Sequence, residues 1–477
     1  MIFERFVDSG LSQHSFVVGC QGSGEIAVID PQRDVDVYLD YARDHGYRIA
    51  YVMDTHIHAD FASGARELAD KTGARLMLSG YDAGEHFRVQ FPHEDLHEGD
   101  RIDIGNVRIE VRHTPGHTPE HLMFVVFDGA RSRDEPIALI TGDFLFVGSL
   151  GRPDLLGEEA KRALARQMFA SVRDKLADLP DGVEVHPGHG AGSACGAGMA
   201  GRPVSTLGYE RATNPYLDPS LSEDAFVEKL LHGLPEIPDF YPRNKGINSE
   251  GPKDVIPLPG MQAIEPDEVA RRVEAGEVTV IDLRDPLAFG GGHVPGALGI
   301  GIRGPFANWA GWVTPDDQPV ILVDGSGDPA VIEQAVRSMV RTGRDYIDGY
   351  VRGGMAAWAA AGLPLDTLAQ VDARGAADRV ARGEARLVDV RTPAEYAAGH
   401  VDAAVHRPVA ETREGIPGVD LEEPVAVVCG SGYRSTVAAS ILQRLGYRRV
   451  MNVVGGMGAW EAAGVRQASS SGRRDAA

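Results

Sequence analysis

The stretch THIHADF, residues 55–61, follows the apolar run YRIAYVMD, residues 47–54, and decides the fold of the first part of the chain. On an extended backbone, side chains two residues apart point the same way, so the imidazoles of His56 and His58 and the carboxylate of Asp60 can converge on one point. Histidine nitrogens and carboxylate oxygens are common metal ligands. The stretch therefore predicts a metal site at the end of a strand.

Three further candidate ligands each follow an apolar run that is typical of a β-strand. They are His117 in HTPGHT, Asp143 in LITGDFLF and His189 in HPGHG. A histidine taken alone is more often a surface or hydrogen-bonded residue than a ligand. That interpretation also covers the other histidines considered, His14, His45, His86, His93 and His121. The ordered set favours metal ligands instead, because ligands gathered from several strand ends fit a metal pocket on the rim of a sandwich.

This set, HxHxD followed by GH, GD and GH, resembles the metallo-β-lactamase superfamily over residues 1–202. The resemblance implies an αββα sandwich. Hydrolases of the superfamily, such as glyoxalase II, hold two metals and carry HxHxDH, in which the last histidine binds the second metal. Phe61 stands at that position here. An apolar ring cannot ligate a metal, so a dinuclear hydrolase is disfavoured.

Within the superfamily the region looks most like the persulfide dioxygenases, in which two histidines and one aspartate hold one Fe(II). The resemblance implies a mononuclear iron with the ligands His56, His117 and Asp143. A 2-His-1-carboxylate set leaves open positions on iron for a thiolate sulfur and for O₂. The residues expected to hold ligand tautomers and water by hydrogen bonds, or to act as alternative ligands, are His58, Asp60 and His189.

Two more residues are candidates for contact with the substrate. Arg152, in LGRPD, matches a family position near the substrate and could hold a carboxylate of a thiol carrier, although a lone arginine is as often a salt-bridge or surface residue. Cys195, in GHGAGSACG, follows His189 in a glycine-rich loop and could handle sulfur, but a buried cysteine is more commonly a small hydrophobe. Cys20 is expected to be structural.

The rest of the chain repeats itself at an interval of about 105 residues, which fits two tandem domains. VIDLRDPLAFGGGHVPGA at 280–297 aligns with LVDVRTPAEYAAGHVDAA at 387–404, and YVRGGMAAWAAAGLP at 350–364 aligns with NVVGGMGAWEAAGV at 452–465. Each copy alternates short Val- and Ile-rich strands with helices. This pattern predicts two small α/β domains, each with a parallel sheet.

The second copy places Cys429 at a strand-to-helix turn, where PVAVV runs into CGSGYRS and then into TVAASILQRLG. Backbone N–H groups of such a turn, the helix N-terminus and Arg434 would stabilise a thiolate or a persulfide anion. The loop resembles the rhodanese active loop, and Cys429 through Arg434 makes the six-residue form associated with sulfur transfer. The supporting residues that match the family are Asp389, Arg391, Glu395, His400 and Trp460. Cys429 is therefore the expected nucleophile.

The first copy departs from this pattern in its loop, VDGSGDPA. Asp324 stands where the second copy has Cys429, and Pro329 stands where it has Arg434. A carboxylate cannot carry a persulfide, and the added negative charge repels anions. We therefore expect a catalytically inactive domain with a packing or docking role.

The sequence predicts five segments. They are a metallo-β-lactamase-like domain at 1–202, a connector or partly ordered extension at 203–261, a rhodanese-like domain without the cysteine at 262–366, a rhodanese domain at 370–467 and a disordered tail at 468–477. The connector is rich in Pro, Asn and Gly and contains one short amphipathic stretch, SEDAFVEKLLHGL. No chemistry is visible in it.

Composition limits the classes of partner. The 477 residues exceed what one core supports, and 43% hydrophobic and 24% charged residues are ordinary for a globular protein. A net charge of -22 argues against nucleic acid and anionic membranes as partners. No uncharged apolar run reaches about 18 residues, and three widely spaced cysteines are expected to be thiols. A cytoplasmic homo-oligomer is the expectation.

The resemblance to persulfide dioxygenase–rhodanese fusions covers nearly the whole chain and implies a coupled reaction. A low-molecular-weight thiol persulfide would be oxidised with O₂ to sulfite at the iron. Cys429 would take the sulfane sulfur of a second persulfide and pass it to sulfite, giving thiosulfate, as in sulfide detoxification. The alternatives are a zinc thioester hydrolase resembling glyoxalase II with a sulfurtransferase domain, and a non-catalytic sulfur carrier or scaffold. The sequence does not identify the thiol carrier.

Overall fold

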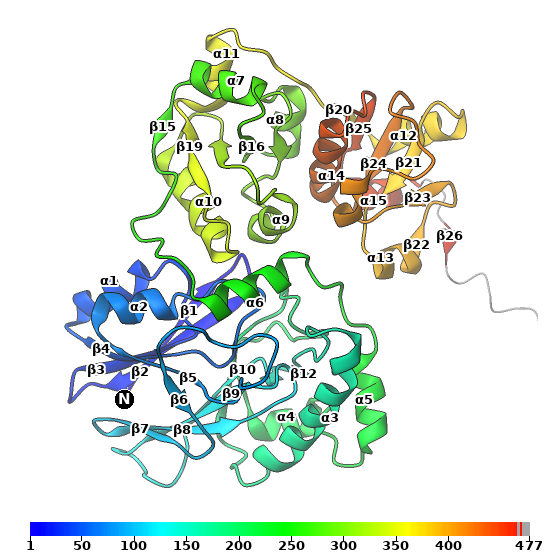
Figure 1. Cartoon of the computed structure of the whole chain (residues 1–477). Helices are drawn as coiled ribbons and strands as arrows, with labels where there is room; N and C mark the ends of the chain where they lie inside the picture. Colours follow the sequence, from blue (N-terminus) through cyan, green and yellow to red (C-terminus); the bar gives the residue numbers. More distant parts are fainter. Residues whose placement is uncertain (465–467, 470–477) are drawn as a thin grey trace, which may run out of the picture. The chain divides into compact units, whose positions relative to one another are not determined.

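The computed structural model describes residues 1–464 and 468–469, which form two compact units (Figure 1). The first unit comprises Met1–Pro257 with Val340–Gly343, and the second comprises Leu258–Met339 with the residues from Arg344 onward. Of the tail predicted to be disordered, only 468–469 are described, and the rest lies outside the described residues. The predicted domain bounds stay a prediction.

Two six-stranded sheets form the centre of the first unit. The first sheet runs in the order β1 (Ile2–Asp8), β2 (Gln13–Cys20), β3 (Glu25–Ile29), β4 (Arg48–Met53), β5 (Arg75–Ser79), β6 (Glu94–Leu96). The second runs in the order β14 (Ser205–Thr206), β13 (Glu184–Pro187), β10 (Ala138–Gly142), β9 (Leu122–Asp128), β8 (Val107–His113), β7 (Arg101–Ile104). A short pair, β11 (Leu145–Phe146) and β12 (Ser149–Leu150), lies beside them.

Three apolar clusters show the layers of this unit. One cluster joins inward residues of both sheets, including Phe16, Ile109 and Phe124. A second packs α1 (Asp36–His45) and α2 (Ala65–Thr72) on the first sheet, and a third packs α3 (Glu158–Lys175) and α5 (Glu223–Leu231) on the second (Figure 1). Helix, sheet, sheet and helix therefore follow one another, and the predicted αββα sandwich is confirmed.

The segment predicted as a connector packs on the metal-motif loop instead of only linking domains. It contains α4 (Leu207–Thr213), α5 and α6 (Phe240–Glu250). In α6, the Lys245 Nζ donates to the Ile57 carbonyl at 2.8 Å. Asn248 Nδ2 donates to the carbonyls of His58 and Phe61, both at 2.8 Å. The helix thus fixes the backbone of THIHADF.

The second unit contains two five-stranded sheets, and every strand pair in them is parallel. The first sheet has the order β15 (Ala263–Ile264), β19 (Ile347–Val351), β18 (Val320–Val323), β16 (Thr279–Asp282), β17 (Leu298–Gly299). The second has the order β20 (Ala369–Val371), β25 (Val450–Val453), β24 (Val425–Val428), β21 (Arg386–Asp389), β23 (Ala404–His406). The same strand order in both confirms the predicted tandem α/β domains.

Helices surround these sheets. Around the first are α7 (Pro266–Glu274), α8 (Pro286–Gly291), α9 (Phe306–Val313), α10 (Pro329–Arg341) and α11 (Gly354–Ala360). Around the second are α12 (Ala373–Ala381), α13 (Pro393–Ala398), the 3₁₀ turn η1 (Val409–Glu414), α14 (Tyr433–Arg444) and α15 (Gly456–Ala462). A short pair joins β22 (Gly399–His400) and β26 (Ala468–Ser469).

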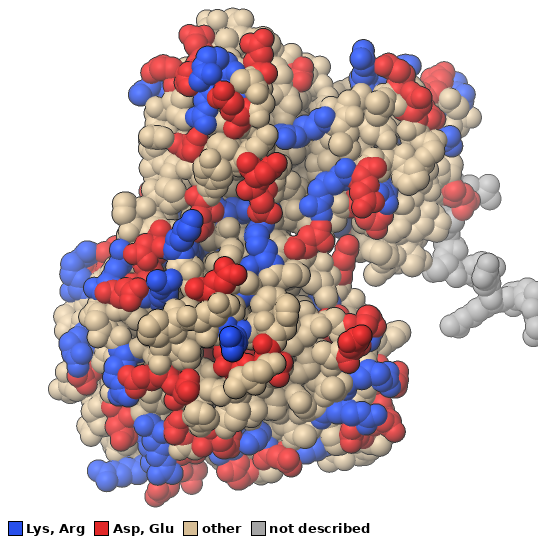
Figure 2. Space-filling model, in the orientation of Figure 1, with Lys and Arg blue, Asp and Glu red and all other residues tan. Residues whose placement is uncertain are grey.

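On the face shown in Figure 2, Lys and Arg are interspersed with Asp and Glu and do not gather in one patch. Among the residues that the structure describes, no helix has both the length and the apolar character needed to cross a membrane.

The hydrogen bonds of Asn248 lead to a stability prediction. Its side chain also accepts from the backbone N–H of Ser63 at 2.8 Å. Asn248→Ala would leave buried carbonyls of the motif loop without donors, so we expect the first unit to lose about 3 kcal/mol of unfolding free energy. Calorimetry and urea unfolding measure this loss. The control is Asn106→Ala, because Asn106 is exposed; its unfolding should match the wild type, and equal stability of both variants would contradict the prediction.

Candidate functional site

Three predicted ligands meet at the ends of their strands. His56 follows β4, His117 follows β8 and Asp143 follows β10. One ligand atom from each lies within 4.8 Å of the others, and all three residues are buried. The Nε2 of His117 is 3.6 Å from the Oδ2 of Asp143. These separations allow one ion to be held by all three side chains.

Hydrogen bonds fix which nitrogen of each histidine is available. The Nδ1 of His117 donates to the Arg152 carbonyl at 2.8 Å. The Nδ1 of His56 lies 2.9 Å from the Thr55 hydroxyl, which itself donates to the Asp30 carboxylate at 3.0 Å and so accepts from His56. Both Nδ1 atoms therefore carry the proton, and both Nε2 atoms keep a free lone pair.

Two further atoms of the triad have no hydrogen-bond partner inside the protein. His56 Nε2 and Asp143 Oδ2 are buried without a hydrogen-bond partner. A buried polar atom in this state costs free energy. Burial also holds the pKa of His56 and of His117 below the usual range, so both imidazoles are neutral, the form that binds a metal. The donor set therefore fits a divalent transition metal.

His189 lies between two carboxylates. Its Nδ1 is 2.7 Å from Asp143 Oδ1, and its Nε2 is 2.7 Å from Asp60 Oδ2. Burial alone would lower its pKa, but the two carboxylates raise the pKa of His189 well above the usual range, so the ring is an imidazolium. His58 turns to Asp30 instead, with Nε2 3.0 Å from Oδ1. The hydrogen-bonding roles expected for these residues agree with this geometry and stay predictions.

Phe61 follows Asp60 at the end of the THIHADF loop. Its side chain is 1% exposed, and its ring centre lies 4.3 Å from that of His58. No ligand atom is available there.

Cys195 lies beside this cluster. A ligand atom of Cys195 lies within 4.8 Å of Asp60 and His189, and its sulfur is 3.9 Å from the Tyr241 hydroxyl of α6. Burial, followed by the nearby carboxylates, raises the pKa of the Cys195 thiol well above the usual range, so the thiol is protonated. Tyr241 and Lys245 were not found from the sequence, since each is a single residue of an irregular, Pro-rich segment.

Arg152 is engaged by the protein itself. Its guanidinium forms two bonds to Asp154, at 2.6 and 2.8 Å, and donates to the carbonyls of Ala194 and Pro235, at 3.0 and 2.7 Å. Its side chain is 1% exposed. As placed, it holds three loops together around the carbonyl that binds His117. Its expected contact with a substrate carboxylate stays a prediction.

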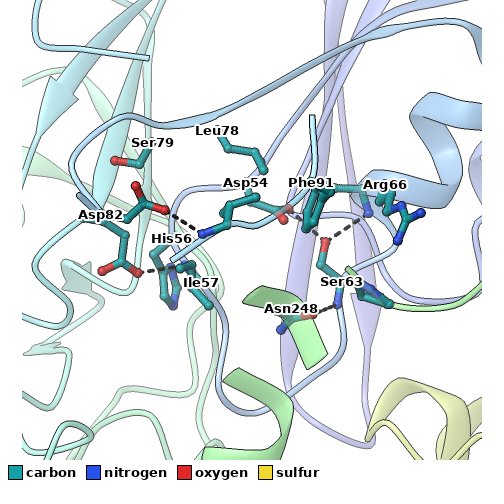
Figure 3. A pocket seen from close by; sticks show the side chains of 14 residues that line it. Asp54, His56, Ile57, Ser63, Arg66, Leu78, Ser79, Asp82, Phe91 and Asn248 are labelled. Atoms are coloured by element: carbon teal, nitrogen blue, oxygen red, sulfur yellow. Dashed lines mark hydrogen bonds between the residues drawn. The ribbon is translucent and has the colours of Figure 1, made fainter. Parts of the chain in front are cut away.

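A pocket reaches His56 from the surface (Figure 3). It has a cavity volume of about 20 Å³, and its lining includes Asp54, Ser63, Leu78 and Asp82. The lining combines apolar and charged groups.

The loop of Cys429 is built as the sequence predicts. The N–H of Gly432 donates to the sulfur of Cys429 at 3.1 Å, and the Ser435 hydroxyl lies 3.4 Å from it, at the start of α14. Arg434 forms two bonds to Glu395, at 2.7 and 2.6 Å, and this pairing lowers the pKa of Glu395 to about 2. The guanidinium is thereby fixed beside the loop. A Cβ added at Gly430 would lie only 3.2 Å from Nη2 of Arg434.

The corresponding loop of the first copy is filled by its own side chain. The Asp324 carboxylate accepts from the N–H groups of Ser326, Gly327 and Asp328, at 3.2, 2.5 and 3.3 Å. These amides point into the space where an anion bound by the loop would lie. The copy has therefore replaced a ligand with a fixed internal carboxylate.

Replacing one triad residue tests the metal site. His117→Ala removes a ligand, and we expect metal bound per chain to fall about tenfold or more after reconstitution with iron or zinc, measured by plasma mass spectrometry. The control is His113→Ala, since His113 lies at the end of the same strand and its Nε2 bonds to the Pro119 carbonyl, away from the triad. Unchanged metal content in a folded His117→Ala protein would show that the ligand assignment is wrong.

Comparison with known families matches both units. The metallo-beta-lactamase superfamily matches residues 8–189, and the rhodanese-like domain matches 265–361 and 372–463. A crystal structure of a metallo-beta-lactamase from Staphylococcus aureus is 36% identical, with a TM-score of 0.65, and the match covers 74% of this chain and 99% of that one.

Curated relatives cover the first half of the chain. The beta-lactamase hydrolase-like protein of Agrobacterium fabrum is 30% identical, over 47% of this chain and 54% of that protein, so the match spans about half of that relative's length. The hydroxyacylglutathione hydrolase of a Polaromonas species is 29% identical, over 50% of this chain and 93% of that enzyme. The mitochondrial persulfide dioxygenase ETHE1 of Homo sapiens is 31% identical, over 46% of this chain and 76% of that enzyme. The chain therefore belongs to the metallo-β-lactamase superfamily, as a fusion of a metallo-β-lactamase domain homologous to persulfide dioxygenases with two rhodanese-like domains.

Proposed function

We propose that the chain oxidises the sulfane sulfur of a low-molecular-weight thiol persulfide to sulfite with O₂ at a mononuclear iron, and transfers persulfide sulfur to sulfite through Cys429. Homology to persulfide dioxygenases and rhodaneses supports a metal-binding enzyme of sulfur metabolism that acts on small sulfur compounds. The observation that carries the finer proposal is the buried cluster of His56, His117 and Asp143, in which His56 Nε2 and Asp143 Oδ2 have no hydrogen-bond partner, with Phe61 in place of a second-metal ligand. A cytoplasmic location and a homo-oligomer stay predictions.

The oxidation balances as RSSH + O₂ + H₂O → RSH + SO₃²⁻ + 2H⁺, in which the sulfane sulfur gives four electrons to O₂. Iron, when bound, would supply the redox chemistry. The protein holds the neutral ligand tautomers through Thr55 and the Arg152 carbonyl. His189 keeps one oxygen of Asp143 occupied and turns the other toward the ligand set. Burial of the triad excludes bulk water from the reacting sulfur.

The transfer balances as RSS⁻ + SO₃²⁻ → RS⁻ + S₂O₃²⁻. The Cys429 thiolate attacks the terminal sulfur of the persulfide, the S–S bond to the carrier breaks, and RS⁻ leaves. Sulfite then attacks the sulfane sulfur held on Cys429, and the thiolate is released with thiosulfate. The N–H of Gly432 faces the sulfur and stabilises its negative charge in both steps.

Replacing the rhodanese cysteine separates the two reactions. With Cys429→Ser, oxygen uptake on a persulfide should continue at the wild-type rate, sulfite should accumulate, and thiosulfate should fall at least about a hundredfold because the nucleophile is lost. An oxygen electrode with chromatographic sulfite and thiosulfate analysis measures this. The control is Cys20→Ser, which changes a cysteine that lies away from both sites. Unchanged thiosulfate formation in Cys429→Ser would refute the coupling.

Metal identity separates the proposal from a zinc thioester hydrolase, which the likeness to hydroxyacylglutathione hydrolase keeps as a second candidate. We expect about one iron per chain and oxygen uptake that depends on persulfide, because the Phe61 position cannot complete a second site. Two zinc ions per chain with hydrolysis of a glutathione thioester would favour the hydrolase. Persulfide binding without oxygen uptake or hydrolysis would favour a sulfur carrier.

A further inference from the structure

We propose that the inactive rhodanese copy binds the body of the thiol carrier that delivers sulfur to Cys429, through a pocket whose free cation is Arg303. The inference rests on the proposed sulfur transfer. It assigns a ligand class, thiols with an anionic group remote from the sulfur, to a site in the second unit that the transfer reaction itself does not use.

The pocket lies beside the loop of the first copy that corresponds to the loop of Cys429. It has a volume of about 540 Å³ and ends against the filled loop at Asp324 and Gly325. Its walls come from two further stretches of the same copy, 283–288 and 301–305. The Asp324 carboxylate occupies the N–H groups of that loop, and the hollow beside it is open to solvent.

The rim of the pocket belongs to the active loop of the other copy. Ser431 and Tyr433 line it, and they follow Cys429 in the same six-residue loop. The Tyr433 hydroxyl donates to the Gly301 carbonyl at 2.9 Å. A Cβ added at Gly304 would overlap the Tyr433 ring, so the close packing at this point requires glycine. The two loops are thereby fixed against each other, with the hollow beside the catalytic loop.

Of the two cations in the lining, Arg284 and Arg303, one is left for a ligand. Arg284 is bound to Asp282 and to the Gly292 carbonyl. Asp285 accepts from the first N–H groups of α8. Arg303 is exposed, and within the described part of the chain it has no hydrogen bond or ion pair. A free guanidinium at the wall favours a carboxylate or a phosphate.

The separation of Arg303 from the loop of Cys429 suits a thiol carrier whose anionic group lies far from its sulfur. Binding energy from the part of a substrate that does not react can position the part that does. With its anionic group on Arg303 and its body in the hollow, a carrier would point its persulfide toward the loop of Cys429. Glutathione supplies carboxylates and coenzyme A supplies phosphates, so both belong to the class.

Calorimetric titration of the full chain with S-methylglutathione and with S-methyl-coenzyme A tests binding, because a capped sulfur neither reacts at Cys429 nor binds as a thiolate. We expect binding of at least one ligand, weakened about five- to tenfold by Arg303→Glu and less so at high salt. Gly325→Phe should abolish it, since a Cβ added at Gly325 has no protein atom within 4 Å and a ring placed there would occupy space in the hollow that Gly325 lines. Preferential binding of S-methylglutathione would indicate recognition of a carboxylate, and preferential binding of S-methyl-coenzyme A would indicate recognition of a phosphate.

Matched controls are Arg374→Glu, at an exposed arginine outside the pocket, and Gly291→Phe, at a glycine with the same free space outside the lining. Both should bind as the wild type does. Failure of the wild type to bind either ligand, or equal affinity in Arg303→Glu, would overturn the proposal.

Kinetics of thiosulfate formation distinguish this proposal from the transfer on which it rests. Arg303→Glu should raise KM for glutathione persulfide or coenzyme A persulfide about fivefold with kcat unchanged, and should leave KM for the uncharged 2-hydroxyethyl persulfide unchanged. An equal rise in KM for charged and uncharged donors would contradict the proposed pocket but not the transfer through Cys429. A wild type that makes no thiosulfate from any donor would overturn the transfer through Cys429.

Discussion

The metal site depends on the different hydrogen bonding of the two carboxylate oxygens of Asp143. Oδ1 is held by His189, and Oδ2 is left unpaired beside His117. His189 is in turn held by Asp60, so a chain of charged hydrogen bonds fixes the one anionic ligand from behind. Because such a network is buried, each member constrains the next, and the ligand atoms are positioned before any ion binds.

The same principle extends outward to the backbone. The carbonyls of the THIHADF loop are held by Lys245 and Asn248 of α6, a helix almost two hundred residues further along the chain. The loop at 55–61 belongs to no strand or helix and so lacks regular backbone hydrogen bonding of its own. Donors from a remote helix replace it, because buried backbone carbonyls need partners. The site is therefore complete only in a unit that extends to Pro257.

The sequence was sufficient for the layers and for finding the three side chains that the structure brings together, because strand ends carry a recognisable order of histidines and aspartates. It was sufficient also for the loop of Cys429, whose residues are contiguous. It did not show the partners of Arg152, which come from Asp154, Ala194 and Pro235, or the contribution of α6. Such contacts join single residues across long separations, and no local periodicity marks them. For the same reason, the free state of Arg303 followed only from the structure.

The filled loop of the first rhodanese copy has a chemical consequence. Persulfides and oxidants modify thiols, so a cysteine at this position would change its state whenever substrate accumulates. Asp324 holds the same turn through hydrogen bonds to Ser326, Gly327 and Asp328 and has no sulfur to modify. The loop therefore keeps one shape at every level of sulfane sulfur. Asp324 and Ser431 of the Cys429 loop line the same pocket, so one side of that pocket is inert to sulfane sulfur.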